Sequence, residues 1–399
     1  MKRFITASAV GALCAGAAFA DGHANEIKLG IILGFTGPIE TITPPMADGA
    51  ELAMAEVTDS GLLLGGAKVT PVRGDSTCVD AGAATAVAER QITGDGVSGI
   101  VGADCSGVTG AILQNVALAN GVVMISPSAT SPGLSHAENE DNGLFFRTAP
   151  SDARQGVVMT EVLMEQGIEK VAVTYTNNDY GKGLADSFQA AYEAAGGSVT
   201  ISAAHEDGKA DYSAEVGALA AAGGDRLVVA GYVDQGGAGV VRASIDSGAF
   251  DTFHFPDGMI GRSLQDQFGS EIEGSSGQHP GTDSPGVAQF SAIVGDAFDA
   301  SSPFTPESYD AAALIMLAMQ AAGSSDPADY KGKVMDVANA PGEQIFPGEL
   351  GKALQILTDG GDIDYVGASA VELIGPGESA GNYRQIEIKD GEIATVQYR

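Results

Sequence analysis

Short β-branched segments alternate with alanine-rich segments along most of this 399-residue chain. In the first part of the chain, the segments with strand character are 27–35, 68–75, 98–104 and 122–127. After 145–152 the alternation starts again, and the segments with strand character are then 170–177, 198–206 and 226–232. Strands that alternate with helices predict parallel sheets. We therefore expect an α/β fold with two doubly wound parallel-sheet lobes, whose strand ends face a shared crevice.

The N-terminal segment 1–20 begins with two basic residues, continues with small apolar residues and ends in Ala-Phe-Ala. This pattern predicts a cleaved secretory signal peptide. Cleavage removes Cys14 and leaves Cys78 and Cys105 in an oxidising compartment, where a disulfide is expected. The alternative is a reactive thiolate at Cys105, which requires an unpaired sulfur and a neighbouring base.

The chain is strongly acidic, with 52 acidic against 20 basic residues and a formal net charge of −32. Such a charge repels nucleic acid and anionic lipid surfaces, so neither is an expected partner. Beyond the signal segment, no apolar run reaches the roughly 20 residues that a membrane-spanning helix needs. The longest run, 311–322, predicts a buried helix, and the mature chain is not expected to be embedded in a membrane.

Three strings resemble enzyme motifs but occur in the wrong context. The string GESAG at 377–381 has the form of a nucleophile elbow, but a strand is expected after it and no histidine follows Ser379. The glycines of 94–99 precede a strand instead of following one, which excludes a dinucleotide-binding loop. The segment 180–183 lacks the hydroxyl of a phosphate-binding loop, and the histidines lack metal-ligand spacing. We expect no catalytic residue, no cofactor and no metal.

Two neighbouring strand ends in the first part carry hydroxyl groups. Ser106 follows the strand at 98–104, near the start of a helix expected at about Gly107. Its side chain and the free amides there suit a carboxylate, although ordinary helix capping is the alternative. The next strand ends in SPSATSP, which offers Ser128 and Thr130 and, by itself, is a turn signal. Two adjacent loops with neutral donors together favour a small carboxylate as ligand.

In the second part, Tyr180, Tyr232 and Asp257 each follow a predicted strand. Half-buried packing is the alternative for the tyrosines, and Pro-Asp-Gly around Asp257 is itself a turn signal. A carboxylate opposite neutral donors suits an ammonium group. The sequence thus predicts a zwitterion held between uncharged donors on one lobe and a lone negative group on the other.

From about Ile27 to its end, the chain resembles the leucine/isoleucine/valine-binding protein family, the type I periplasmic solute-binding proteins of ABC importers. The strings that carry the resemblance are GFTGPIE, GDSTCVDAGAA, VGADCSGVTG, VMISPSATSPGLS, FFRTAPSDARQG, NNDYGKGLA, YDA at 309–311 and GELGKALQIL. Their order and spacing are more specific than any one of them.

The resemblance implies two lobes joined by a three-strand hinge that close on the ligand. The implied lobe boundaries are 25–147 with 281–380, and 148–280 with 381–399. By resemblance, Cys78 and Cys105 match the family's disulfide.

The resemblance also assigns the ligand-binding residues. Ser106 and Thr130 match carboxylate contacts, Ser128 matches a small residue that uses its backbone, and Ala129 between them belongs to the same set. Asp257 matches an acidic partner of the α-ammonium group, and Tyr180 and Tyr232 match wall positions of the second lobe. The loop at 37–49 departs from the family, because Thr-Pro-Pro stands where an aromatic residue commonly lines the side-chain pocket.

These observations predict a periplasmic, monomeric solute-binding protein that captures a small branched-chain or apolar amino acid and delivers it to an ABC transporter permease. Short amides, urea and aromatic acids are the alternative ligands within the same fold. A secreted hydrolase that uses Cys105 or Ser106 is the rival from another class, and it would need a histidine within reach. The ligand-binding half of a membrane receptor is a third reading, for which the sequence offers no spanning helix.

Overall fold

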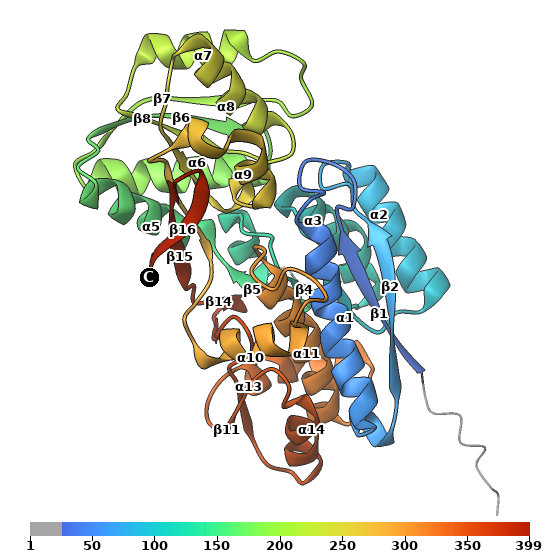
Figure 1. Ribbon diagram of the computed structural model, residues 1–399. Helices are drawn as coiled ribbons and strands as arrows, with labels where there is room; N and C mark the ends of the chain where they lie inside the picture. The colour runs from blue at the N-terminus through green and yellow to red at the C-terminus, as the bar shows by residue number, and fades with distance from the viewer. Residues whose placement is uncertain (1–25, 140) are drawn as a thin grey trace, which may run out of the picture.

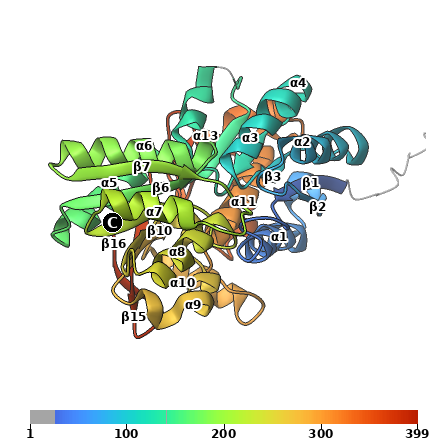
Figure 2. The ribbon, with the colours of Figure 1, turned by 90° about the horizontal axis from the view of Figure 1, so that it is seen from above.

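The computed structural model describes residues 26–139 and 141–399, so the signal segment predicted at 1–20 lies outside the described residues. Within them the chain forms two lobes, each built around a seven-stranded sheet. Figure 2 shows the lobes side by side, with α1 to α4 in one and α5 to α8 in the other. The expectation of two doubly wound α/β lobes is confirmed.

The first sheet has the strand order β13-β14-β5-β4-β3-β1-β2. Its strands are parallel except at one edge, where β13 pairs antiparallel with β14. They are β1 (Glu26–Leu33), β2 (Lys68–Asp75), β3 (Ile100–Gly102), β4 (Met124–Ser126), β5 (Phe145–Pro150), β13 (Leu373–Ile374) and β14 (Glu378–Ser379).

The second sheet has the order β16-β15-β10-β9-β8-β6-β7, and β15 pairs antiparallel with both of its neighbours. Its strands are β6 (Lys170–Thr176), β7 (Ser198–His205), β8 (Arg226–Ala230), β9 (Phe253–Phe255), β10 (Ser276–Pro280), β15 (Tyr383–Lys389) and β16 (Glu392–Tyr398). A small third sheet pairs β11 (Glu343–Ile345) with β12 (Ile363–Tyr365).

Helices cover both sheets (Figure 1). Those of the first lobe are α1 (Thr43–Ser60), α2 (Ala81–Glu89), α3 (Ser106–Ile112), α4 (Leu118–Asn120), α10 (Pro285–Val294), α11 (Thr305–Ala322), α12 (Pro327–Tyr330), α13 (Val334–Ala338) and α14 (Leu350–Thr358). Those of the second lobe are α5 (Asp152–Glu165), α6 (Asp179–Ala194), α7 (Ser213–Ala222), α8 (Gly236–Ser247) and α9 (Arg262–Phe268).

Helix α11 is the central element of the first lobe. Every side chain from Tyr309 to Met319 is buried, and the helix packs against α1, α13 and α14. The buried helix predicted at 311–322 is therefore confirmed. Over the residues that the structure describes, no helix has the length and apolar character required to cross a membrane.

The strand expected after the string at 377–381 is present, but the C-terminal segment 382–399 also holds a second strand that was not expected. The segment forms a hairpin of β15 and β16, which turns at Asp390 and Gly391. Their φ angles of 55° and 78° are both positive, as a tight type I′ hairpin turn requires. An Asp-Gly pair between two β-rich runs is the usual sequence signal for this turn.

Three connections carry the chain between the lobes. They join β5 to α5, β10 to α10, and β14 to β15. The sheets thus combine strands from distant parts of the sequence, as the resemblance implies. The residue boundaries of the lobes, 25–147 with 281–380 and 148–280 with 381–399, stay a prediction.

Cys78 and Cys105 form the expected disulfide, with a separation of 27 positions. The bond joins the loop that follows β2 to the loop that follows β3. Because the Cys105 sulfur is bonded, the reactive-thiolate alternative is wrong.

We expect the double variant Cys78→Ala/Cys105→Ala to lose roughly 3–4 kcal/mol of unfolding free energy, because the open chain gains loop entropy when it unfolds. Urea denaturation measures the loss. Reductant should lower the stability of the wild type to that of the variant and leave the variant unchanged. Equal stability of the oxidised wild type and the variant would contradict this account.

Candidate functional site

A pocket lies between the lobes at the carboxyl ends of the two sheets. The pocket is narrow, and the cavity between its walls measures only about 20 Å³. The predicted residues that line it are Ser106, Ser128, Thr130, Tyr180, Tyr232 and Asp257. The lining residues that were not predicted as contacts are Ile39, Ile42, Asp104, Cys105, Gly258 and Phe304.

Ser106 is the first residue of α3, one position earlier than expected. Cys105 occupies the N-cap position and makes no side-chain cap. The capping alternative for Ser106 is therefore wrong: its Oγ instead accepts a hydrogen bond from the Ser131 N–H at 3.0 Å. Since a hydroxyl both accepts and donates, the Ser106 proton remains available to a ligand.

The conformation of the loop after β4 is stabilised by hydrogen bonds of its serine hydroxyl groups. Ser126 Oγ donates to Ala103 O at 2.5 Å and accepts from Ala129 N at 2.9 Å. Ser128 Oγ donates to Asp104 O at 3.1 Å. The Thr130 hydroxyl is buried in the pocket wall and lies against the Asp152 carboxyl, whose pKa is raised by burial and lowered in part by a side-chain hydrogen bond from this hydroxyl. The Thr130 N–H has no hydrogen-bond partner among the described residues, so this backbone donor remains available to a ligand.

Ala129, which was predicted with the ligand contacts, does not line the pocket. Its N–H is bonded to Ser126, and its carbonyl accepts from Arg147 Nη1 at 2.9 Å. Both polar groups of its backbone face away from a ligand, so Ala129 belongs to the support of the wall.

Asp104 is a lining residue that the sequence argument missed. Its Oδ2 accepts from Gly34 N at 2.6 Å and its Oδ1 from Ser76 Oγ at 2.7 Å. The carboxyl thus fastens the ends of β1, β2 and β3 to one another. Burial raises its pKa above the ordinary value. Its position next to Cys105, in the same strand-end loop as Ser106, could have indicated that Asp104 lines the pocket.

Asp257 is the acidic group of the second lobe, with 1% of its surface exposed. Its Oδ1 accepts from Tyr180 Oη at 2.6 Å and Gly258 N at 2.7 Å, and its Oδ2 accepts from Gln155 Nε2 at 2.9 Å. Tyr180 stacks on Tyr232 with ring centroids 5.2 Å apart. The two tyrosines therefore form a wall that also orients the carboxylate.

A second carboxylate stands behind Asp257. Gln155 Nε2 also donates to Asp152 Oδ1, at 2.7 Å, so one amide group bridges two buried acids. Burial raises the pKa of Asp257, and burial followed by the charge of Asp257 raises the pKa of Asp152 well above its ordinary value. The prediction of a lone negative group was therefore wrong, because Asp104 and Asp152 accompany Asp257.

The apolar side of the pocket comes from Ile39, Ile42 and Phe304. The Thr-Pro-Pro segment of the loop at 37–49 starts helix α1, with proline in its first positions. This start leaves Ile39 and Ile42 in the wall. Phe304 arrives from the distant segment before α11, and no local sequence signal marks it.

Hydrogen bonds between the loop at 37–49 and Asp234 join the two lobes. Asp234 of the second lobe accepts from Thr41 N at 3.0 Å and from Thr41 Oγ1 at 2.8 Å. The Asp234 N–H donates to Pro38 O at 3.1 Å. The two lobes are therefore in direct contact beside the pocket, and fold and pocket together define a two-lobe binding protein.

Residues 26–343 match the family model described as periplasmic binding protein. The chain is 30% identical to Leu/Ile/Val-binding protein homolog 3 of Brucella melitensis over 322 residues, which cover 79% of this chain and 84% of that relative. It is 29% identical to the Leu/Ile/Val-binding protein BraC3 of Rhizobium johnstonii, with 79% and 85% coverage. The chain belongs to the periplasmic binding protein family.

Solved structures show the same fold. The leucine-binding protein LivK of Thermotoga maritima superposes with a TM-score of 0.78 at 21% identity, covering 93% of this chain and 98% of the other. LivJ of Streptococcus pneumoniae, in complex with isoleucine, gives 0.73 at 22% identity, with 93% and 99% coverage. A solute-binding protein of R. palustris, in complex with 4-hydroxybenzoate, gives 0.73 at 19% identity, with 94% and 97% coverage.

We expect Asp152→Asn to stabilise the ligand-free protein at neutral pH by on the order of 1 kcal/mol, because folding of the variant requires neither the burial of a charge nor the uptake of a proton at this position. The pKa of Asp152 is higher in the folded than in the unfolded chain, so its ionisation costs stability as pH rises through the raised value. The advantage of the variant should therefore shrink on acidification. Thermal unfolding across pH measures it.

The matched control is Asp296→Asn, which removes an exposed charge. It should change the stability by less than about 0.5 kcal/mol. A variant Asp152→Asn that is less stable than wild type at neutral pH would show that the ionised carboxylate is a net stabilising group.

Proposed function

We propose that this protein is the solute-binding component of an ABC importer and that it holds a small apolar amino acid between its lobes. One observation carries the proposal: the Ser106 hydroxyl and the Thr130 N–H on one lobe are donors without a protein acceptor among the described residues, and they share a pocket with the buried Asp257 carboxylate on the other lobe. A zwitterion satisfies both sides at once.

The carboxylate end of the ligand lies against the first lobe in this proposal. The Ser106 hydroxyl and the Thr130 N–H supply neutral donors there. Hydrogen bonds from neutral donors to a carboxylate are charge-assisted and stronger than those to a neutral acceptor. Ser128 contributes shape, because its hydroxyl is bonded to Asp104.

The ammonium end lies against Asp257, Tyr180 and Tyr232. A buried carboxylate attracts a cation strongly, and the faces of aromatic rings attract one as well. The relatives named Leu/Ile/Val-binding proteins and the LivJ complex with isoleucine support an amino acid as the ligand.

The side chain of the ligand lies against Ile39, Ile42 and Phe304, which favours a branched or otherwise apolar group. The R. palustris complex with 4-hydroxybenzoate shows that the fold also accommodates an aromatic acid. Such an acid carries no ammonium group and would leave Asp257 unpaired. The same objection applies to uncharged amides and urea.

The protein in this proposal binds and releases its ligand unchanged and passes it to a membrane permease from the periplasm, as a monomer and without a cofactor. The hydrolase alternative requires a histidine next to a nucleophile. No histidine lines the pocket within the described part of the chain, and the Cys105 sulfur is in the disulfide.

Calorimetry with leucine, isoleucine and valine should show binding, and Asp257→Ala should weaken it by roughly 2–4 kcal/mol, the scale of a buried ion pair that loses one member. Benzoate, acetamide and urea serve as comparison ligands. Tight binding of benzoate with no binding of any amino acid would overturn the proposal in favour of an aromatic acid.

Ser106→Ala should weaken leucine binding by roughly 1–2 kcal/mol, the effect of one charge-assisted hydrogen bond. Leucinamide, which lacks the carboxylate, is the comparison ligand and should lose less. An equal loss for both ligands would remove Ser106 from the carboxylate contacts.

A further inference from the structure

The segment 145–156, FFRTAPSDARQG, leaves the first lobe and enters the second. None of its residues lines the pocket. Its polar groups nevertheless contact the back of both pocket walls, and the proposed function has given them no role. Two side chains, Arg147 in β5 and Gln155 in α5, make most of these contacts.

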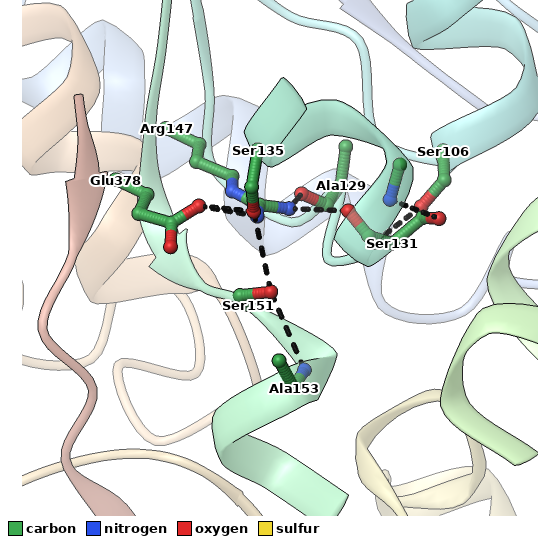
Figure 3. Close-up of polar contacts among 9 residues, drawn as sticks. Ser106, Ala129, Ser131, Ser135, Arg147, Ser151, Ala153 and Glu378 are labelled. Carbon is green, nitrogen blue, oxygen red and sulfur yellow. Dashed lines mark hydrogen bonds and ion pairs between the residues drawn. The ribbon is translucent and has the colours of Figure 1, made fainter. Parts of the chain in front are cut away.

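Arg147 lies behind the wall that carries Thr130, with 1% of its surface exposed. Its Nη1 donates to Ala129 O at 2.9 Å and to Ser131 O at 3.0 Å. Figure 3 shows the guanidinium between these carbonyls on one side and Glu378 on the other. The carbonyl between them, Thr130 O, accepts from Asp152 N at 2.8 Å.

These bonds dictate which way the intervening peptide groups point. In a trans peptide, the carbonyl of one residue and the N–H of the next point in opposite directions. Ala129 O faces Arg147, so the Thr130 N–H faces away from Arg147. Thr130 O faces Asp152, and the Ser131 N–H reaches Ser106 Oγ on the other side. The direction in which the donors of the Thr130 loop point is thus fixed by contacts on the side of the loop away from the pocket.

Gln155 lies behind Asp257, on the second lobe, and is fully buried. Its Oε1 accepts from Asp257 N at 3.2 Å, and its Nε2 donates to Asp257 Oδ2 at 2.9 Å. One amide side chain therefore holds both the backbone and the carboxylate of Asp257. This fixes the rotamer of the acidic group that faces the pocket.

Each of the two side chains is also tied to another connection between the lobes. Arg147 Nη2 forms an ion pair of 2.6 Å with Glu378 Oε2 in β14, and Ser135 Oγ bonds to both partners. Gln155 Oε1 accepts from Gln278 Nε2, at 3.2 Å, in β10. The supports of the two walls are therefore anchored at the hinge.

We propose that Arg147 and Gln155 are the positioning residues of the ligand site: Arg147 aims the donors for one end of the ligand, and Gln155 aims the carboxylate for the other end. Neither residue touches the ligand. The inference rests on the proposed function in taking the ligand to be a zwitterionic amino acid.

The binding test uses Arg147→Lys and Gln155→Met with three probes: leucine, leucinamide without the carboxylate, and 4-methylpentanoate without the ammonium. In Arg147→Lys, the preference for leucine over leucinamide should fall by roughly tenfold or more, and the preference over 4-methylpentanoate should persist. In Gln155→Met, the preference for leucine over 4-methylpentanoate should fall by a similar factor, and the preference over leucinamide should persist. A general loss of structure weakens all three probes by the same factor, and that result would overturn the proposal.

The chain offers matched controls. Arg226 is a partly buried arginine that bonds to Gln166 at 2.6 Å and Ser276 at 2.9 Å, and Gln91 is a fully buried glutamine that bonds to Val72 O at 2.8 Å. Neither residue lines the pocket. Arg226→Lys and Gln91→Met should leave both preferences unchanged. The same selectivity change in a control would overturn the assignment.

A second measurement needs no ligand. Amide hydrogen exchange should speed up in the segment 127–133 of Arg147→Lys and in the segment 256–261 of Gln155→Met, each without the other. Equal acceleration of both segments in either variant would overturn the positioning roles. If wild-type protein bound no amino acid, the proposed function would fail, and the exchange pattern would still decide this inference.

Discussion

The carboxylate of Asp257 is the group on which the proposed ligand site depends, because it is buried in the pocket between the lobes. Within the described residues no lysine or arginine pairs with it, and its partners are a tyrosine, an amide side chain and a backbone N–H. Removing an ion from water costs several kcal/mol, which hydrogen bonds from neutral groups offset only in part. In the proposed function, the ammonium group of the ligand offsets the rest and so favours contact between the two lobes.

The side of the pocket that belongs to the first lobe is held in place by covalent and hydrogen bonds between its loops. Three strands of the first sheet end side by side, and their loops are joined by the Cys78–Cys105 bond and by the hydrogen bonds of Asp104 to Gly34 and Ser76. With these loops fixed, hydroxyl groups that would be mobile on a free loop keep one orientation. Pre-ordered donors lose little conformational entropy on binding, so their hydrogen bonds contribute more to affinity.

The features that could be predicted from the sequence are those that depend on residues close together in the chain. Alternating strands and helices predicted both sheets, and hydroxyl-rich strand ends led to Ser106, Ser128 and Thr130, which do line the pocket. The hairpin at 383–398 was missed although Asp390-Gly391 signals it. Phe304 and Gln155 could not be predicted in this way, since their places depend on contacts between residues far apart in the chain. Asp152 is such a case too: only the folded structure brings it next to Asp257.

In the proposed function, the two ends of the site select a ligand by its charges, and the apolar wall selects it by the size and shape of its side chain. The donors of the first lobe and the acid of the second act on opposite charges, so a molecule that lacks one of them loses a whole charge-assisted contact. The wall of Ile39, Ile42 and Phe304 acts through apolar area alone, and one methylene group is worth only about 1 kcal/mol there. In this proposal the charged ends fix the class of ligand, whereas the wall distinguishes among apolar side chains by small margins.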